Sequence, residues 1–313
     1  MNSTDVRSTA ELAQVIRDAR DTRRPLRIVA RQRWSGAGSP AQRVAPDIAS
    51  VCVAPLAGVV EYVPSDLTLT VRAGTTLAEL DAATAVHNQW CPLLAWGDDA
   101  GSVGATFATA TAGPCASALG RPRDIALGVE FVDGTGATIR GGGRVVKNVA
   151  GFDLTRLMVG AFGTLGVITE VTVRLRARPT VDRSFCILAR ADAEPGAPEP
   201  GAALAIALRR AEIMPIACEV LDTRVAGALS LPAGAVIVRY GGNRALVDAG
   251  RRCADAAGGL TEIDTDIWTR FRALDPHPRR SDTSPGAASV ARRVKNRFDP
   301  EGILNTGLME GLA

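Results

Sequence analysis

Glycine and other small residues gather in two stretches where the backbone itself could bind a ligand. The first, residues 31–39, reads RQRWSGAGS and follows a short predicted strand. A glycine-bearing loop after a strand can turn its amide groups toward a diphosphate. Gly36 and Gly38 alone are a weak signal, because the same residues are equally common in a surface loop. The two interpretations are about even.

The second stretch, residues 96–113, reads WGDDAGSVGATFATATAG and consists almost wholly of Gly, Ala, Ser and Thr after Gly101. A backbone that lies against a flat ring system or a diphosphate needs short side chains and amides that are free to donate. The alternative is a helix of small residues packed under another element. Because Val103 and Phe107 are the only large apolar residues after Gly101, we favour ligand contact.

Residues 141–179 predict a helix, a glycine turn and a strand in unbroken order. Asp153 can cap a helix with one apolar face, and the glycines of residues 163–166 can take positive φ. From Val167 the period changes to two, which predicts a strand with one wet side. The residues expected to face inward are Val167, Thr169, Val171, Val173 and Leu175, and those expected to face solvent are Glu170, Thr172, Arg174 and Arg176. By itself the pattern slightly favours an ordinary αβ unit without a ligand.

Side chains that could act as a general acid or base are few. The chain has two histidines, and His87 is expected at a surface or helix end. His277 has arginines nearby that could hold a carboxylate, although a solvated loop is the better interpretation. Lys147 could reach a bound phosphate or simply pair with Asp153.

Metal sites are not predicted. The six cysteines lie far apart without a CxxC pair, and there is no HxxxH, HxH or acidic cluster. We therefore expect reduced thiols and no iron–sulfur cluster in this chain. No apolar run resembles a signal peptide or a membrane span, which predicts a cytoplasmic location.

Length and charge restrict the fold and the partners. A chain of 313 residues is expected to form two domains, and 46% hydrophobic with 22% charged residues is a globular composition. A net charge of +3, spread along the chain, gives no basic patch for nucleic acid. In residues 133–136, DGTG, the glycines join two extended segments instead of opening a helix, so no nicotinamide site is indicated.

Residues 180–285 carry a second pattern. Two strands flank each of two helices in the order βαββαβ, with one further helix near Trp268, and this order is typical of ferredoxin-like domains. A basic helix follows at residues 290–298 and returns toward the first domain.

Several motifs together resemble a known family. They are LTVRAGTTLAEL, GSVGATFATATAG followed by RPRDIALGVEFVDGTG, VVKNVAGFDLTRLMVGAFGTLGVITEV, and the tail VKNRFDPEGILNTGLM. With these motifs the chain is similar to the FAD-binding subunits of bacterial glycolate oxidases, in the vanillyl-alcohol-oxidase or PCMH-type flavoprotein superfamily. The resemblance covers residues 8–179 and the tail.

The resemblance implies an α+β fold. Residues 1–179 would be a PCMH-type FAD-binding domain of two αβ subdomains, residues 180–285 a small ferredoxin-like cap, and residues 286–313 a C-terminal helix and tail. It also implies a non-covalently bound FAD, because neither small-residue loop holds a histidine to tether it. The family's diphosphate loop is richer in glycine than QRWSGAGS, and this departure bears on FAD affinity. The implied cofactor-binding residues are Trp34, Ser35, Gly36, Ala37, Gly38, Ser39, Gly101, Ser102, Val103, Gly104, Ala112, Gly113, Asp124, Gly166, Val167 and Ile168.

The function that the resemblance implies is that of an FAD-binding subunit in a multi-subunit glycolate (2-hydroxy acid) oxidase. A second flavin subunit and an iron–sulfur subunit would complete the chemistry, and any membrane association would come through them. No catalytic residue is assigned, and His277 and Lys147 are weak candidates. Two alternatives stay open: a self-sufficient flavin oxidoreductase acting on another hydroxylated substrate, and an assembly subunit that has lost FAD.

Overall fold

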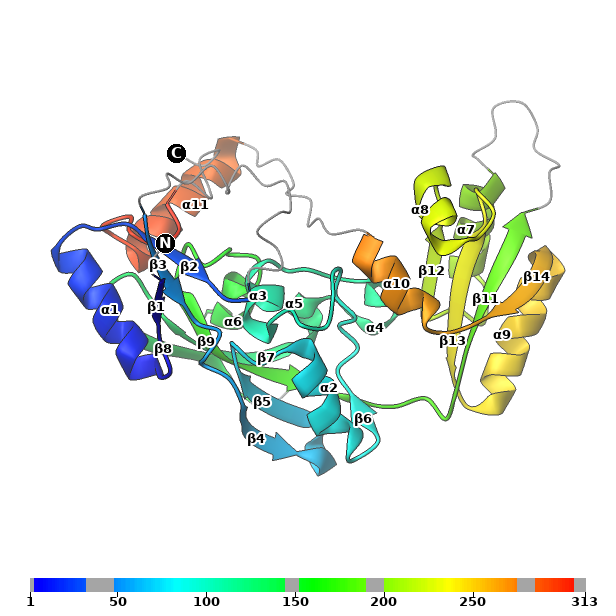
Figure 1. The fold of residues 1–313 in the computed structure, drawn as a ribbon, viewed down its shortest axis with the longest axis horizontal. Coiled ribbons are helices and arrows are strands. Elements are labelled where there is room, and N and C mark those ends of the chain that lie inside the picture. Colours follow the sequence, from blue (N-terminus) through cyan, green and yellow to red (C-terminus); the bar gives the residue numbers. More distant parts are fainter. Residues whose placement is uncertain (1–2, 32–47, 144–151, 190–199, 275–284, 307–313) are drawn as a thin grey trace.

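The chain folds into two parts that lie side by side along the long axis of the molecule (Figure 1). The computed structural model describes residues 3–31, 48–143, 152–189, 200–274 and 285–306. The first part comprises the described residues up to 177 together with residues 285–306, and the second comprises residues 181–274. The C-terminal helix α11 (Pro285–Phe298) thus returns to the first part, as the sequence predicts.

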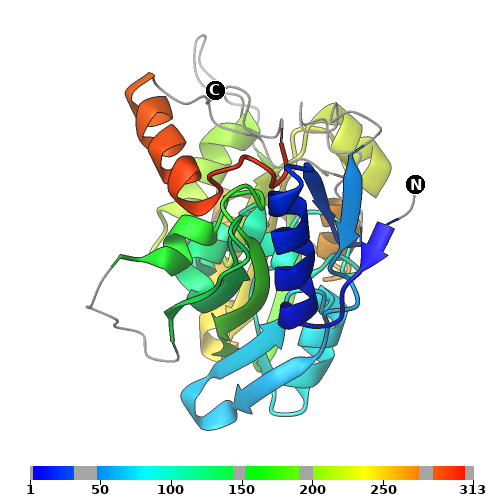
Figure 2. The same cartoon turned by 90° about the vertical axis from the view of Figure 1, so that its left-hand side faces the viewer.

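A small parallel sheet and helix α1 (Thr9–Asp21) open the first part. The sheet has the order β1-β3-β2, with β1 at Ser3–Asp5, β2 at Leu26–Val29 and β3 at Ala49–Cys52. The residues Ser8-Thr9-Ala10-Glu11 predict a capping box, and the structure confirms half of it. The Ser8 hydroxyl accepts a hydrogen bond from the Glu11 amide, but the Glu11 carboxylate accepts one from the Arg7 amide instead of the Ser8 amide. The helix buries its apolar stripe between this sheet and the larger one (Figure 2).

The larger sheet has five antiparallel strands in the order β4-β5-β9-β7-β8. Its strands are β4 (Val59–Val63), β5 (Thr68–Arg72), β7 (Ala126–Val132), β8 (Thr138–Gly142) and β9 (Val167–Arg174). Residues 58–63 and 67–73 predict two strands joined by a proline turn. The structure confirms this hairpin, in which the 3-10 turn η2 (Pro64–Asp66) joins β4 to β5. A two-stranded ladder of β6 (Gln89–Trp90) and β10 (Arg176–Ala177) lies beyond this sheet.

Short helices cover the sheet. They are α2 (Leu77–Ala85), α3 (Val103–Ala108), α5 (Pro122–Ile125) and α6 (Leu154–Met158). Helix α4 (Ala116–Leu119) packs against the second part instead. Thr76 followed by Glu79 predicts a capping box, and this box starts α2 in the structure. Asp153 caps α6 by accepting a hydrogen bond from the Arg156 amide. The apolar pattern predicts that this helix ends at Gly163, but it ends at Met158 because Gly160 and Phe162 take positive φ.

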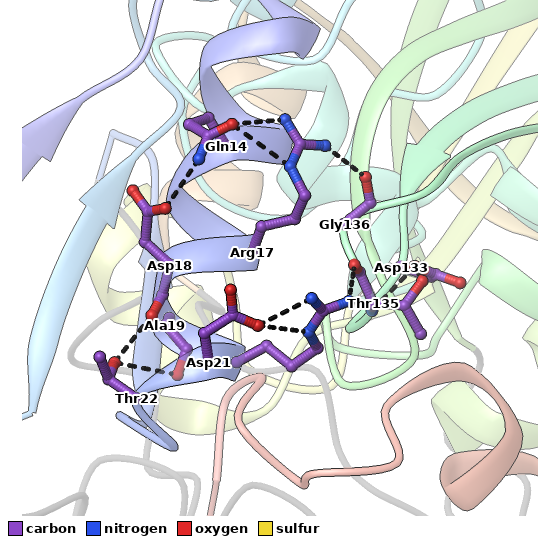
Figure 3. A network of polar contacts seen from close by, with 10 residues as sticks. Gln14, Arg17, Asp18, Ala19, Asp21, Thr22, Asp133, Thr135 and Gly136 are labelled. Carbon is purple, nitrogen blue, oxygen red and sulfur yellow. Dashed lines mark hydrogen bonds and ion pairs between the residues drawn. The ribbon is translucent and has the colours of Figure 1, made fainter.

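The glycine turn at residues 133–136 joins β7 to β8 and packs against α1 (Figure 3). Arg17 donates to the Gly136 carbonyl oxygen at 3.1 Å, and Arg20 donates to the Thr135 carbonyl oxygen at 2.9 Å. Gly136 has φ +80°, and a Cβ there would lie 2.4 Å from the Cγ of Arg17. These glycines therefore serve a tight turn under a helix.

The prediction of a single wet side for β9 is wrong. In its pairing with β7, the register shifts between Glu130 and Phe131, and Thr169 is the extra residue of a bulge. Beyond the bulge the alternation changes face, so Val167 packs with α1 whereas Ile168 and Val171 pack in the main core. Because β9 is also a central strand, both of its faces are largely covered.

A buried carboxylate occupies the bulge. Glu130 is 6% exposed and accepts hydrogen bonds from Thr9, Thr169 and Arg140. Burial alone would raise the pKa of Glu130, but these hydrogen bonds outweigh it and lower the pKa. Burial, followed by the neighbouring Glu130 charge, raises the pKa of Glu170. The ionised Glu130 thereby ties α1 to β7, β8 and β9.

The second part is an antiparallel sheet of order β12-β13-β11-β14 with helices on both faces. Its elements are β11 (Val181–Ala189), α7 (Pro200–Arg209), β12 (Ala217–Val220), α8 (Thr223–Leu229), β13 (Val236–Gly242), α9 (Arg244–Ala257), β14 (Gly258–Ile263) and α10 (Ile267–Leu274). This is the ferredoxin-like arrangement that the βαββαβ order predicts. The added helix α8, which the sequence pattern missed, begins where Asp222 caps the Val225 amide.

Candidate functional site

Three segments that the sequence singles out converge at the end of strand β5. A Cβ on Gly104, in α3, would lie 2.5 Å from the Cβ of Ala73. The Ala73 amide donates to the Thr169 carbonyl oxygen of β9 at 2.8 Å. Arg31, where the first small-residue loop begins, donates to the Gly74 carbonyl oxygen at 3.3 Å. The structure thus brings together the start of the first loop, the second loop and the start of β9.

The amides of residues 101–104 do not have the freedom that the sequence interpretation assumes. The amides of Gly101, Val103 and Gly104 donate to the carbonyl oxygens of Asp98, Thr75 and Ala73 respectively, at 2.8–3.2 Å. The Ser102 hydroxyl accepts from the Ala105 amide, and all four residues of this segment are buried. The prediction of free donors is therefore wrong for Gly101, Val103 and Gly104. Here the small residues allow α3 to approach β5 closely, which is the packing alternative.

The open small-residue surface lies further along, at residues 108–112 and Gly160. Ala108, Thr109, Ala112 and Gly160 are half-buried, and Ala110 is exposed. Two backbone hydrogen bonds hold the two segments together: the Gly160 amide donates to the Phe107 carbonyl oxygen at 3.0 Å and the Phe162 amide donates to that of Ala108 at 2.8 Å. We call this surface, residues 108–112 with Gly160, the small-residue strip. The sequence analysis favoured ligand contact for residues 96–113 as a whole, which includes the run ATATAG, and named Ala112 as a site residue, but it missed Gly160.

Unusual backbone conformations gather around the small-residue strip. Ala110 has φ 53° and Phe162 has φ 54°, and both are non-glycine residues in the left-handed region. Leu94, which borders the strip, has φ 35°. Such conformations cost about 1–3 kcal/mol each and cluster at ligand sites, where the surrounding structure holds them. The strip therefore has a preformed shape.

Two further segments frame the strip. The Cβ that Gly113 lacks would lie 1.7 Å from the carbonyl oxygen of Leu94, so glycine is required there. Gly166 likewise allows Phe131 of β7 to approach, because a Cβ there would lie 2.6 Å from the Phe131 Cδ2. The side chains of Val167 and Ile168 are buried in the two cores, and these residues precede Thr169–Glu170, where pairing with β5 ends. Any ligand contact of Val167 and Ile168 would come from their backbone.

The sequence pattern predicts a strand over residues 124–132, but Asp124 lies in helix α5 and strand β7 begins at Ala126. Its carboxylate accepts a hydrogen bond from the Arg121 amide at 3.0 Å, so it caps a helix on an exposed surface. Its carbonyl oxygen accepts a hydrogen bond from Arg174 at 3.4 Å. These contacts account for Asp124 as a structural residue.

Several predicted residues lie outside the described part of the chain. They are Trp34, Ser35, Gly36, Ala37, Gly38 and Ser39 of the first loop and the two weak catalytic candidates Lys147 and His277. His87 is exposed just after α2, as predicted, with its ring at 5.2 Å from that of Tyr62 in a T-shaped arrangement.

The tail contributes a residue that sequence reasoning did not single out. Asn305 is 7% exposed, and its side chain accepts a hydrogen bond from the Ile28 amide at 2.7 Å and donates one to the Phe162 carbonyl oxygen at 2.8 Å. It therefore cross-links strand β2 of the small sheet to the turn beside the strip. Its place in the tail motif ILNTG was the available signal.

Two largely buried arginines of the second part have carboxylate partners. Arg272 of α10 pairs with Asp99 at 2.5 Å, and Arg239 of β13 pairs with Asp182 at 2.6 Å. Burial raises the pKa of the Cys115 thiol to about 11 and that of Cys91 to about 12, so both stay protonated at neutral pH. Within the described residues, no three His, Cys, Asp or Glu side chains come together as a metal site.

The sequence pattern of a known protein family matches the same region. The family is described as an FAD binding domain, and it matches residues 5–142. Residues 5–142, somewhat less than half of the chain, are thus similar to FAD binding domains. They include the small sheet, α3 and most of the strip, with Gly160 beyond the matched segment. FAD is therefore the cofactor of the first part.

The domain fits FAD by the character of its residues. The strip offers backbone and small side chains in a strained, preformed shape, which suits a flat ring system or an extended nucleotide. Residues 101–104 fit less well, because three of their amides already have carbonyl partners.

Among curated proteins, the chain is similar to flavin-linked dehydrogenases and oxidases. Glycolate oxidase subunit GlcE of Escherichia coli is 41% identical over 130 residues, which are 41% of this chain and 37% of that protein. Glycolate oxidase subunit GlcD of Bacillus subtilis is 32% identical over 42% of this chain and 28% of its own length. A D-lactate dehydrogenase of Archaeoglobus fulgidus is 40% identical over 33% of this chain and 23% of its own length. The chain thus matches less than half the length of each of these relatives.

Solved structures share the whole fold. An alkyldihydroxyacetonephosphate synthase superposes with a TM-score of 0.73 at 14% identity, covering 97% of this chain and 76% of its own. A substrate-bound p-cresol methylhydroxylase superposes with a TM-score of 0.67 at 15% identity, covering 95% of this chain and 63% of its own. The fold is the PCMH-type FAD-binding fold, as the sequence predicts. At this identity the likeness establishes the fold alone.

Proposed function

We propose that the chain is the FAD-binding subunit of a multi-subunit glycolate (2-hydroxy acid) oxidase. The observation that carries the proposal is the small-residue strip, which has a strained, preformed backbone and lies mostly within the segment that matches the FAD binding domain family. The similarity to two glycolate oxidase subunits supports the substrate class. In this proposal the cofactor lies along the strip, with the backbone of Gly166, Val167 and Ile168 at one end.

The ion pairs of two arginines at the boundary between the two parts favour a subunit that needs partner subunits over a self-sufficient enzyme. Oxidation of a hydroxy acid needs a base for the hydroxyl proton and a cation for the carboxylate. FAD supplies the chemistry of hydride acceptance when it is bound. Of the described arginines between the parts, Arg239 and Arg272 each already hold a carboxylate of this chain. Neither could bind a substrate carboxylate without giving up that partner.

The packing between the two parts also supports a subunit that acts with partner subunits. Leu94 and Trp96 of the first part pack against a hydrophobic cluster that includes Ala217 of β12 and Phe271 of α10. The rings of Trp96 and Phe271 lie 5.1 Å apart in a T-shaped arrangement. The second part is therefore docked by side-chain packing at the boundary with the FAD-binding domain.

The domain division that we propose is residues 1–179, 180–285 and 286–313. The first would bind FAD, the second would be a ferredoxin-like cap, and the last a helix and tail that close on the first. The four hydrophobic clusters support this division, since two lie within the first part with its returning tail, one lies within the second, and one joins them.

The proposed partners are a second flavin subunit and an iron–sulfur subunit, with the complex in the cytoplasm or attached to a membrane through those partners. Within the described residues, no helix is both long and apolar enough to cross a lipid bilayer. A membrane contact of the complex is therefore assigned to the partners in this proposal.

Anaerobic mixing with glycolate tests the function. We expect FAD on the isolated chain to stay oxidised with glycolate, and to become reduced when the chain is assembled with its partner subunits. Dithionite is the control that shows that the bound flavin can be reduced. Rapid reduction by glycolate in the isolated chain would contradict the subunit proposal and favour the self-sufficient oxidoreductase. Failure to retain FAD would favour the assembly subunit.

A further inference from the structure

A buried arginine of the second part, Arg272, forms hydrogen bonds with residues 94–99, a loop of the first part. Arg272 in α10 is 2% exposed, and its Nε donates to the Ala95 carbonyl oxygen at 2.9 Å while Nη2 pairs with Asp99 at 2.5 Å. In return, the Gly97 amide donates to the carbonyl oxygen of Arg272 at 3.0 Å. That carbonyl belongs to the last turn of α10, where carbonyl groups lack helical partners. Figure 1 shows α10 at the boundary between the two parts.

The loop that Arg272 contacts, residues 94–99, has a backbone conformation that its own sequence does not favour. Leu94 has φ 35° and Gly97 has φ 98°. A non-glycine residue in this region persists only where its surroundings fix it. The contacts of Arg272 with Ala95, Gly97 and Asp99 supply that constraint from the second part.

The same loop holds the far end of the small-residue strip. The Trp96 amide donates to the Ala112 carbonyl oxygen at 3.0 Å, and the missing Cβ of Gly113 allows the Leu94 carbonyl to approach. On its other side, the Asp99 carbonyl oxygen accepts from the Ala78 amide at the start of α2. A movement of this loop would therefore displace Ala112 and the surface beside it.

We propose that Arg272 is a positioning residue, through which the second part fixes the shape of the FAD site in the first. The inference rests on the proposed placement of FAD along the strip. Arg272 would not touch the cofactor but would hold Ala112 in place through residues 94–99. FAD binding and docking of the second part would then be coupled.

The side chain must be arginine for this task. The guanidinium donates in two directions at once, to a carbonyl oxygen through Nε and to a carboxylate through Nη2. Lysine carries a single point charge and could keep the pair with Asp99 only by giving up Ala95. Methionine fills a similar volume and makes neither bond.

The test compares Arg272→Met and Arg272→Lys with a matched control, Arg239→Met. Arg239 is also a mostly buried arginine of the second part, but its hydrogen bonds go to Asp182 and its guanidinium lies 5.8 Å from the Trp90 ring centre. For each variant we would measure FAD affinity by titrating the apo-protein, the visible circular dichroism of the bound flavin, and the melting temperature of the apo-protein.

We expect Arg272→Met to weaken FAD binding by about tenfold or more and to change the flavin dichroism, with a smaller loss for Arg272→Lys. Arg239→Met should lower the melting temperature while FAD affinity stays within about twofold of wild type. If Arg272→Met does not fold, Asp99→Asn provides the second variant, because Asp99 is 45% exposed and the change weakens only the ion pair. A loss of FAD affinity in that variant would support the proposal.

Unchanged FAD affinity and dichroism in the folded Arg272 variants, or in Asp99→Asn where Arg272→Met does not fold, would overturn the inference. An equal loss of affinity in Arg239→Met would also overturn it, since general weakening of the second part would then explain the effect. If wild-type apo-protein itself binds no FAD, the proposed function fails, and the inference fails with it. The two failures are thus distinguishable.

Discussion

Replacing Asp299 with alanine is expected to lower the free energy of unfolding by about 3–5 kcal/mol. Its side chain is fully buried and pairs with Lys295, and it accepts hydrogen bonds from the amides of Ile303 and Leu304. Removing the carboxylate would leave an ammonium without its counter-charge and two buried amides without acceptors. Chemical denaturation followed by far-UV circular dichroism measures the change.

Replacing Asp299 should destabilise parts of the structure beyond the tail. Lys295 also donates to the Thr164 carbonyl oxygen at 2.6 Å, and Leu304 pairs with Leu26 of β2. The tail therefore holds both the turn before β9 and the strand that leads into the first loop. The matched control is Glu301→Ala, which removes a nearby exposed pair with Arg23 and should cost no more than about 1 kcal/mol. Equal losses in the two variants would show that Asp299 has no special structural role.

Gly113→Ala is the second change with a large expected effect. The new methyl group would lie 1.7 Å from the Leu94 carbonyl oxygen and 2.6 Å from its carbon, both in backbone. Because backbone cannot move aside as a flexible side chain can, we expect a loss of about 3 kcal/mol or more in stability. Denaturant titration of the apo-protein measures it.

A glycine with open space around it provides the comparison for Gly113. No atom lies within 4 Å of the Cβ that Gly259→Ala would add, and that glycine lies in edge strand β14. We expect this variant to keep wild-type stability within about 1 kcal/mol. If the Gly113→Ala protein were as stable as Gly259→Ala, the backbones of residues 94 and 113 would have to lie further apart than the structure shows.

Local sequence patterns predicted most elements, because their signals are local. The helix caps at Ser8 and Thr76, the Pro64 turn and the βαββαβ order of the second part depend on residues a few positions apart. The bulge in β9 could not be found in this way. It is set by the pairing of Thr169 and Glu170 with Glu130, which is about forty residues away in the chain.

The candidate site was predictable only in outline. Smallness of side chains is visible in the sequence, and it directed attention to residues 96–113. Which amides are free is decided by partners far away in the chain, such as Thr75 for Val103. The hydrogen bond between Asn305 and Ile28 joins residues 277 positions apart, and that between Arg272 and Ala95 joins residues 177 positions apart. No local pattern could therefore reveal them.

Titration of the purified apo-protein with FAD tests directly whether this chain binds FAD in its first part. We expect saturation at one FAD per chain, with the two-banded visible spectrum of oxidised flavin altered by the protein. We also expect Gly113→Ala, at temperatures where it remains folded, to take up less FAD than Gly259→Ala. A protein that stays colourless after soaking with excess FAD and desalting would show that the first part does not bind the cofactor.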